Sequence, residues 1–369
     1  MKIKVCHITT VHPRTDTRIF IKECKSLAKY YEVHLIVADG KENNIVDKVH
    51  IHDIGLRQKS RIKRLRIDSD KALKKALSIN CDIYHFHDPE LISVGVKLKK
   101  AGKKVIYDVH EDLPRQVYSK PYLKNWIKPI LSRIIEWQEN KAAKKFDYII
   151  TATSHIRNRF FKINKNSIDI NNYPVLGEFN SFNNWSLKQN QVCYIGGITE
   201  VRGIKEMVNS LEFNDAKLVL AGTFDDPNLE TKMKYKKLWS KVEYLGFIDR
   251  HQISEVLKIS KAGLVTLHPI INYMEALPVK MFEYMMAGLP VITSDIPLWK
   301  NIVESNKCGI AVNPLNPREI SNAINYIMEN PEKAEKMGEN GQKAVKEKYN
   351  WSIEECKLFD VYNKVLKND

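Results

Sequence analysis

Two glutamates in one stretch of the sequence have the chemistry to hold a hydroxylated ligand. Glu275 and Glu283 stand eight residues apart within residues 272–297, NYMEALPVKMFEYMMAGLPVITSDIP. Carboxylates accept hydrogen bonds from vicinal hydroxyl groups, such as those of a ribose or another sugar. The alternative is that Glu283 is a solvated helix residue and Glu275 an ordinary loop acid, because scattered acids are common on protein surfaces.

The elements around this pair decide where the two carboxylates lie. Pro278 suits the first turn of a helix, and apolar residues recur after it at helical spacing until Gly288 and Pro290 end the helix. A short apolar strand is expected near residues 264–267, and another strand at residues 290–295. Loop, helix and strands therefore meet at one edge of a parallel sheet, where α/β folds usually bind ligands.

A second stretch with suitable chemistry is the turn that follows residue 197. Val192–Gly197 is predicted to be a strand ending in paired glycines, and Ile204–Leu211 to be the next helix. The turn between them carries Arg202 and backbone N–H groups, an arrangement that suits a diphosphate. Paired glycines alone would be weak grounds for a phosphate site.

The segment from Glu275 to Glu283, with the residues after it, closely resembles the Glu-x7-Glu signature of retaining glycosyltransferases of family 4, which have the GT-B fold. The resemblance implies that Glu283 binds the donor ribose and that Glu275 contacts the transferred sugar. Lys280 stands where many members have proline or another neutral residue, and it is a candidate for binding phosphate. Val242–Ile248, which includes Phe247, resembles the family segment whose backbone contacts the nucleotide base.

The resemblance extends to the glycine turn, with one departure. In the family this turn usually reads Gly-Arg followed by Lys-Gly, whereas here Gly197 replaces the arginine and Arg202 takes the place of the lysine. One of the two usual phosphate cations is therefore missing from its expected place. Arg202 is the main candidate for binding the donor diphosphate, and Lys205 or Lys280 would substitute for the missing cation.

In the first half of the chain, a predicted loop at residues 9–17 lies at the carboxyl ends of parallel strands. It precedes a helix for which Asp16 or Thr17 is the expected N-cap. Arg14, Asp16 and Arg18 are candidates for contacting the acceptor or the diphosphate. A capping and surface role is the alternative for the same residues.

Three histidines follow near the ends of later strands. His110 ends the predicted strand Lys104–His110, and it resembles the histidine that family 4 enzymes place between the donor sugar and the acceptor. His85 and His87 are expected to flank an outward loop, where they would form a second acceptor contact. Each of the three could instead be a structural histidine satisfied by a backbone carbonyl.

Composition favours a two-domain globular protein with a basic first half. The chain has 369 residues, of which 43% are hydrophobic and 28% charged, and its apolar runs are too short to span a bilayer. Residues 1–172 hold 35 Lys and Arg against 19 Asp and Glu, whereas the rest holds 24 against 25. The net charge of +15 thus comes from the first half, which suggests an anionic partner.

Two segments concentrate this charge. The basic segment 57–75 is either a solvated helix face or a binding surface. Residues 115–146 interleave lysine and arginine with apolar residues at helical spacing, among them Tyr118, Tyr122, Trp126, Ile130, Ile134 and Trp137. That pattern suits docking on one leaflet of an anionic membrane, and a core-facing helix with a solvated basic side is the alternative.

Signals for cofactors and for export are lacking in the sequence. The six cysteines are widely spaced, which predicts free thiols in a reducing cytoplasm. Residues 1–5 lead directly into a strand, which predicts no signal peptide. We see neither metal-ligand spacing nor an Asp-x-Asp pair in a position that suggests a metal-dependent transferase, so no metal or other cofactor is expected.

The sequence therefore predicts an α/β protein of GT-B type with two Rossmann-like doubly wound domains facing a central cleft. Residues 1–172 would bind the acceptor, residues 173–350 the nucleotide sugar, and residues 351–369 would form a helix returning to the first domain. Catalysis would depend on His110, Glu275 and Arg202.

The resemblance implies retaining transfer of a sugar from a nucleoside-diphosphate sugar to a saccharide acceptor. A lipid-linked acceptor, in the assembly of an O-antigen, capsule or exopolysaccharide, would suit the basic first domain. The expected location is the cytoplasm, peripheral on the inner face of the membrane. The alternatives are a sugar-nucleotide epimerase of GT-B fold and, less well supported, a nucleic-acid-binding protein. A nucleic-acid partner is not expected because it would leave the Glu-x7-Glu segment without a purpose.

Overall fold

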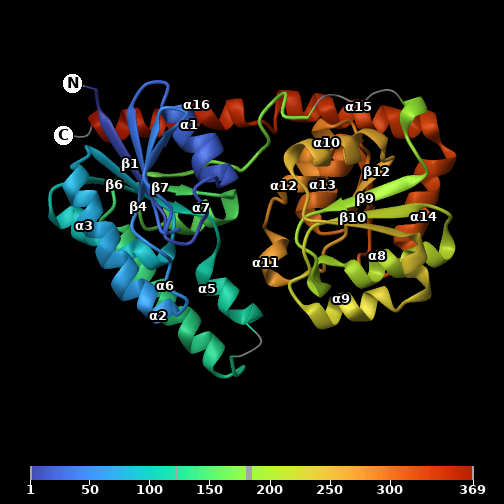
Figure 1. Ribbon diagram of the computed structural model, residues 1–369, viewed down its shortest axis with the longest axis horizontal. Coiled ribbons are helices and arrows are strands. Elements are labelled where there is room, and N and C mark those ends of the chain that lie inside the picture. The colour runs from blue at the N-terminus through green and yellow to red at the C-terminus, as the bar shows by residue number, and fades with distance from the viewer. Residues whose placement is uncertain (1, 121–122, 180–184, 368–369) are drawn as a thin grey trace. The chain divides into compact units, whose positions relative to one another are not determined.

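The computed structural model describes residues 2–120, 123–179 and 185–367. The chain divides into two compact units, unit 1 (Met1–Asn172 with Trp351–Asp369) and unit 2 (Tyr173–Asn350). Each unit is built around its own sheet with helices packed against it (Figure 1). The prediction of two Rossmann-like α/β domains is thus confirmed.

Unit 1 contains an eight-stranded sheet with the strand order β3-β4-β2-β1-β5-β6-β7-β8, parallel except for the β3–β4 pair. Its strands are β1 (Lys4–Ile8), β2 (Glu32–Val37), β3 (Asn44–Val46), β4 (Val49–Asp53), β5 (Ile83–Phe86), β6 (Lys104–Val109), β7 (Tyr148–Thr151) and β8 (Ser167–Asp169). Its α-helices are α1 (Lys25–Leu27), α2 (Arg61–Lys63), α3 (Ser69–Ile79), α4 (Ile92–Lys100), α5 (Leu113–Gln116), α6 (Ile127–Ala143), α7 (Ser154–Phe161) and α16 (Trp351–Lys367). Two π-helical segments, Thr17–Cys24 and Arg64–Asp68, lead into α1 and α3.

The last helix of the chain, α16, packs on unit 1, where Figure 1 shows it in red beside the blue elements. Its first residue, Trp351, donates from Nε1 to Ser26 Oγ at 3.0 Å. Tyr362, from the same helix, is fully buried beside β1 and β5, where it contacts two histidines. An amphipathic helix at the end of the sequence is therefore stabilised by burial of its apolar side in unit 1.

Unit 2 contains a six-stranded parallel sheet with the order β11-β10-β9-β12-β13-β14. Its strands are β9 (Gln191–Ile195), β10 (Lys217–Ala221), β11 (Val242–Gly246), β12 (Ala262–Val265), β13 (Val291–Ser294) and β14 (Gly309–Val312). Its α-helices are α8 (Ile204–Ser210), α9 (Pro227–Lys234), α10 (Arg250–Ile259), α11 (Ile271–Met274), α12 (Val279–Met286), α13 (Pro297–Ser305), α14 (Pro317–Glu329) and α15 (Pro331–Glu347).

The strand order of each sheet reverses at one point, and the loops there diverge to leave room for a ligand. In unit 1 the reversal lies between β1 and β5, and in unit 2 between β9 and β12. The central strands β1, β2, β5, β10 and β12 are buried almost throughout, as expected for parallel strands covered on both faces. The candidate residues of the sequence analysis follow strands β1, β5 and β6 in unit 1 and β9, β11 and β12 in unit 2.

Across residues 2–120, 123–179 and 185–367, none of the helices combines the length and apolarity needed to cross a membrane.

Candidate functional site

Glu283 lies inside α12, and one arginine holds its carboxylate. Both terminal nitrogens of Arg250, at the start of α10, donate to Glu283 Oε1 at 2.9 Å. Arg250 also donates to Glu178 and lies 4.6 Å from the centroid of the Phe179 ring. Among the described residues Glu283 Oε2 makes no hydrogen bond, so this oxygen is available to accept one from a ligand hydroxyl group.

Glu275 lies in the loop between α11 and α12, where it is exposed. Trp299 fixes this loop by donating from Nε1 to Ala276 O at 2.6 Å. Pro278 is the N-cap of α12, and Gly288, with φ of +77°, follows its end. The structure thus confirms the elements that were predicted around both glutamates, whereas their roles as ligands of the donor stay predictions.

The turn after β9 is built from the two glycines and held by two side chains. Gly196 has φ of +135°, a conformation that suits glycine alone. The Gly197 carbonyl accepts hydrogen bonds from Tyr194 Oη at 2.8 Å and from Arg202 Nη1 at 3.1 Å. Although burial opposes its charge, the hydroxyl groups of Tyr273 and Tyr194 raise the pKa of Arg202. A guanidinium cation therefore lies beside the predicted phosphate turn.

The two lysines proposed as the second phosphate cation have different surroundings. Lys205 Nζ lies 2.6 Å from Glu200 Oε1 in a partly exposed ion pair, so it already has a carboxylate partner. Lys280 is the second residue of α12, and its buried Nζ lies 3.7 Å from the centroid of the Tyr194 ring. No hydrogen-bond partner of Lys280 Nζ exists in the part of the chain that the structure describes.

Backbone segments approach one another closely at the carboxyl end of this sheet. A Cβ atom on Gly203 would lie 2.1 Å from Thr266 O, and one on Gly222 would lie 2.0 Å from Gly196 O. Only glycine fits such contacts, which bring the loops after β9, β10 and β12 together. Phe247 follows β11 and is 81% exposed, so its ring is free to pack on a planar group.

In unit 1 the loop after β1 is closed over Asp88. The Asp88 carboxylate accepts from the Thr10 backbone N–H at 2.5 Å and from the Thr9 hydroxyl at 3.1 Å. Arg14, one of the acceptor-side candidates, pairs with both oxygens of Asp39 at 2.6 and 2.7 Å. In this structure Arg14 therefore anchors the loop.

Asp16, the second acceptor-side candidate, is the N-cap of the π-helical segment, as predicted. Its Oδ1 accepts from the backbone N–H groups of Arg18 and Ile19 at 2.9 Å, and His12 lies 3.4 Å from its Oδ2. Although burial raises the pKa of Asp16, hydrogen bonds from His12 and Ile19 lower it below its usual range. The alternative of a capping role thus has direct support, and acceptor contact stays a prediction.

His110 follows β6, and its Nε2 lies 2.7 Å from Asp108 Oδ2. Asp108 is fully buried and accepts from Arg18 Nε at 2.9 Å and from Arg18 Nη2 at 2.8 Å. Burial alone would raise the pKa of Asp108, but Arg18 and His110 hold it well below its usual range. An ionised Asp108 fixes the His110 ring with Nε2–H as donor and leaves Nδ1 for a ligand. His12, whose ring centroid lies 5.1 Å from that of His110, is a further, partly exposed imidazole here.

The prediction that His85 and His87 flank an outward loop is wrong. Both side chains are buried, because His85 lies within β5 and His87 directly after it, between helices on both faces of the sheet. His85 Nδ1 lies 2.9 Å from Tyr362 Oη, and His87 Nδ1 lies 3.1 Å from Asp108 Oδ2. Neither side chain can reach an acceptor outside the protein in this arrangement.

These histidines belong to a buried hydrogen-bonded chain. Its further links join Tyr362 Oη to His7 Nε2 at 3.2 Å and His7 Nδ1 to His87 Nε2 at 2.9 Å. Because Asp108 can only accept, every link is satisfied when each histidine is neutral and donates from Nδ1 toward Asp108. Burial lowers the pKa of all three histidines, to about 4 for His87, in agreement with neutral rings.

The same region brings together two groups of side chains whose ligating atoms lie within 4.8 Å of one another. These groups are His7, Glu23, His85 and His87, and His87, Asp108 and His110. Arg18 lies 3.1 Å from Glu23 and 2.8 Å from Asp108, so a guanidinium cation already accompanies the carboxylate of each group. The sequence-based expectation that no metal is needed stays a prediction.

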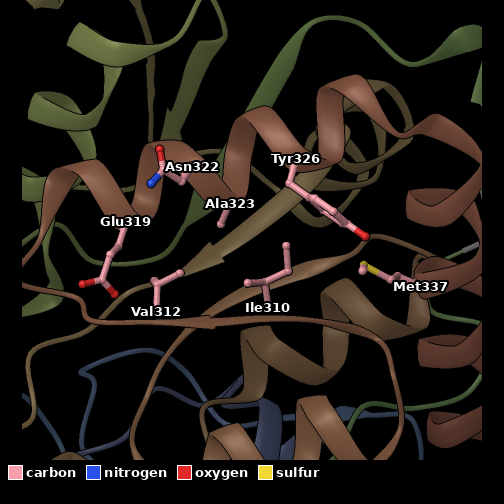
Figure 2. A pocket seen from close by; sticks show the side chains of 7 residues that line it. All are labelled: Ile310, Val312, Glu319, Asn322, Ala323, Tyr326 and Met337. Carbon is pink, nitrogen blue, oxygen red and sulfur yellow. The ribbon is translucent and has the colours of Figure 1, made fainter.

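A pocket of about 440 Å³ lies in unit 2 between β14, α14 and α15 (Figure 2). Its lining is mostly apolar and consists of Ile310, Val312, Glu319, Asn322, Ala323, Tyr326 and Met337. Glu319, its one carboxylate, already accepts from the Asn313 N–H at 3.0 Å and from Asn316 Nδ2 at 2.9 Å. The lining contains none of the donor-binding candidates, which lie around the turn after β9 and on α12.

Sequence reasoning did not find Asp108 or Arg250, although each holds a candidate residue. Asp108 and His110 are two positions apart at the end of a strand, a spacing that puts both side chains on one face and could have indicated the pair. Arg250 is 33 residues from Glu283, and no local pattern connects them.

Comparison with known families matches the two units separately. Residues 178–344 match the family described as Glycosyl transferases group 1, and residues 20–169 match the family described as Glycosyltransferase Family 4. The class of protein is therefore a glycosyltransferase of GT-B architecture. The chain belongs to the group 1 and family 4 glycosyltransferases, as its Glu-x7-Glu segment indicated.

Individual relatives are distant. Phosphatidyl-myo-inositol mannosyltransferase of Mycobacterium leprae is 21% identical over 326 residues, which cover 83% of this chain and 77% of that protein. The chain spans only about half the length of three other curated relatives, since the matched regions cover 45%, 45% and 48% of those proteins.

Two solved structures share the fold over nearly the whole chain. Sucrose-phosphate synthase from Thermosynechococcus elongatus has a TM-score of 0.79 at 16% identity and 100% coverage of both chains. HepE from Anabaena, solved in complex with UDP-glucose, has a TM-score of 0.73 at 14% identity, with 98% of this chain and 99% of that chain covered. At these identities the likeness establishes the fold.

Proposed function

We propose that this glycosyltransferase moves a sugar, with retention of configuration, from a nucleoside-diphosphate sugar to a hydroxyl group of a saccharide acceptor. The observation that carries the proposal is the arrangement in unit 2 of Arg202 and Lys280 beside the glycine turn, with Glu283 on the same helix as Lys280. Cations at a backbone turn suit a diphosphate, and a carboxylate nearby suits a ribose. The likeness to HepE, whose structure holds UDP-glucose, supports a uridine nucleotide as the first donor to test.

In this proposal each group of unit 2 has a defined task. Departure of the nucleoside diphosphate leaves negative charge on its β-phosphate, which Arg202 and Lys280 stabilise, together with the N-terminus of α12. Glu283 Oε2 accepts a hydrogen bond from a ribose hydroxyl group. Glu275 contacts the transferred sugar, and Phe247 packs on the base. This scheme needs no metal.

Unit 1 binds the acceptor in this proposal. His110 lies after β6 with Nε2–H committed to Asp108, so its Nδ1 can accept a hydrogen bond from an acceptor hydroxyl group. Arg14 and Asp16, which now hold the loop after β1, would contact the acceptor at its periphery.

We further propose that the acceptor is lipid-linked and belongs to the assembly of an O-antigen, capsule or exopolysaccharide at the inner face of the cytoplasmic membrane. One face of α6, together with its N-cap residue Trp126, supports this, because the large apolar side chains there are exposed: Trp126 (68%), Ile130 (52%), Ile134 (48%) and Trp137 (61%). Exposed Arg133 and Lys141 accompany them, and Lys141 Nζ lies 5.0 Å from the Trp137 ring centroid. Tyr122, also predicted for this surface, lies outside the described residues.

Such a mixture of exposed aromatic and basic residues suits the headgroup region of an anionic leaflet. The relative from Mycobacterium leprae is named for transfer to a lipid headgroup, phosphatidyl-myo-inositol, which agrees with an acceptor at a membrane surface.

A melting-temperature screen tests the donor part of the proposal. UDP, GDP, ADP and their common sugars are added to the wild type, to Glu283→Ala and to Glu304→Ala, a control at an exposed position of α13. A ligand that binds only the native state raises the melting temperature by mass action. We expect one nucleotide to stabilise the wild type and the control but not Glu283→Ala. Equal responses of all three proteins would contradict the assigned site, and the absence of any response would contradict the donor class.

A further inference from the structure

Lys280 has an environment that the ligand-free fold does not explain. Its Nζ is buried, has no hydrogen-bond partner among the described residues, and lies 3.7 Å from the Tyr194 ring centroid. Burying an ammonium group without a hydrogen-bonded anion is costly, and contact with an aromatic face offsets only part of that cost. A buried amine whose Nζ has no partner among the described residues is expected where a bound anion completes the site.

The turn after β9 places Lys280 and Arg202 side by side. A Cβ atom on Gly196 would lie 2.9 Å from Lys280 Nζ, and a Cβ atom on Gly197 would lie 2.7 Å from Arg202 Nη1. The two cations thus occupy the space above consecutive glycines, which a side chain at either position would fill. Lys280 reaches this turn from α12, whereas Arg202 reaches it from the segment that follows β9.

We propose that Lys280 is the second cation of the phosphate site, which reaches the diphosphate from α12 in place of an arginine at position 197. This inference rests on the proposed function, because it assigns a residue to the diphosphate of the same donor. It also distinguishes Lys280 from Lys205, whose Nζ is already paired with Glu200 at the surface.

Binding of a diphosphate should also change the protonation of Lys280. Burial first, and then the nearby Arg202, lower the pKa of Lys280 well below its usual range, whereas Glu283 and Cys193 raise it by less. The groups that face Nζ are therefore Arg202 from the turn, Glu283 from α12, and Tyr194 and Cys193 from β9. A diphosphate beside Nζ adds negative charge and favours the ammonium form, so binding draws a proton from solvent onto Lys280.

The variant Lys280→Met separates this proposal from a structural role. It keeps the length of the side chain but removes the buried amine, so the ligand-free variant should melt at a temperature equal to or above that of the wild type. Its affinity for UDP and GDP, measured by titration calorimetry, should fall about 10-fold to 100-fold through loss of a charge-assisted contact. The control Lys205→Met should keep the wild-type affinity within about two-fold, because it removes a surface ion pair.

Titrations in Tris and in HEPES at one pH measure the proton uptake. With the wild type the binding enthalpy should differ between the buffers by an amount that corresponds to net uptake, and Lys280→Met should abolish that uptake. Wild-type affinity in Lys280→Met would overturn the proposal, and so would a lowered melting temperature of the ligand-free variant. If neither UDP nor GDP binds the wild type, the proposed function itself fails, an outcome that is distinct from failure at Lys280.

Discussion

Both terminal nitrogens of Arg250 donate to the same oxygen of Glu283, Oε1, and leave Oε2 without a hydrogen bond from the described residues. Arg250 therefore fixes the position of the Glu283 carboxylate and sets the direction in which its second oxygen points. Glu283 resembles the ribose-binding acid of the family. The position of its carboxylate thus depends on an arginine from another helix.

Replacement of Arg250 by methionine should weaken nucleotide binding without removing any group that contacts the nucleotide. We expect about a 10-fold loss of affinity, because a displaced Glu283 carboxylate would lose roughly one charge-assisted hydrogen bond to the nucleotide. Titration calorimetry with the nucleotide selected by the melting screen measures the loss. A double variant with Glu283→Ala should be no weaker than Glu283→Ala alone, and additive losses would show that Arg250 does not act through Glu283.

The buried histidine chain should make stability depend on pH. The folded-state pKa of His87 is depressed to about 4, so its contribution is complete above the unfolded value of about 6.5 and is lost as the pH falls toward 4. Several carboxyl groups titrate in the same range, so the test compares the wild type with His87→Gln. Urea unfolding at pH 7, 6 and 5 should show a shallower decline for the variant, by at most about 1.4 kcal/mol per pH unit. Parallel profiles would contradict a neutral buried His87.

Gly203→Ala should destabilise unit 2 far more than Gly102→Ala destabilises unit 1. Both glycines have positive φ, +81° and +76°. An alanine in this left-handed conformation lowers the free energy of unfolding by about 1 kcal/mol. A Cβ atom at 203 would also lie 2.1 Å from Thr266 O, whereas one at 102 meets no atom within 4 Å. Overpacking of this kind adds about 1 to 3 kcal/mol. Equal losses of unfolding free energy, relative to the wild type, in the two variants would refute the close contact between the loops after β9 and β12.

The two exposed tryptophans at the N-cap and on the surface of α6 should determine binding to anionic vesicles. Exchange of Trp126 and Trp137 for serine should lower partitioning onto phosphatidylglycerol-containing vesicles by about 10-fold or more, given the apolar surface that each ring would bury. Tyr235→Ser is the control, because Tyr235 is 87% exposed but lies in unit 2. Cosedimentation measures the effect. If the double variant sediments like the wild type, or the wild type does not prefer anionic vesicles, α6 is not a membrane surface.

The sequence predicted well what depends on neighbouring residues. Pro278 and Gly288 bound the helix that carries Glu283, as expected from the fixed φ of proline and the left-handed φ of glycine. The N-cap at Asp16 was likewise one of two predicted. Such local signals are physical preferences of the backbone, so they can be read without knowledge of the fold.

The errors and omissions concern contacts between residues far apart in the chain. His85 and His87 were expected to flank an outward loop, yet Tyr362, 277 residues after His85, contacts the His85 ring. The burial of Lys280 against Tyr194 likewise depends on how α12 packs against β9. Polar residues inside a buried strand find their partners only in the folded state, so hydrophobic pattern alone cannot place them.

The central claim, retaining transfer from a nucleoside-diphosphate sugar, is tested most directly by following turnover of that donor by proton NMR. The donor is the nucleotide sugar that most raises the melting temperature, and the first product formed is observed before its anomers equilibrate. We predict that the released or transferred sugar has the same anomeric configuration as the donor, and that Glu283→Ala abolishes turnover whereas Glu304→Ala does not. A first product of opposite configuration, or conversion of the donor to an epimer without release of the nucleoside diphosphate, would contradict the claim.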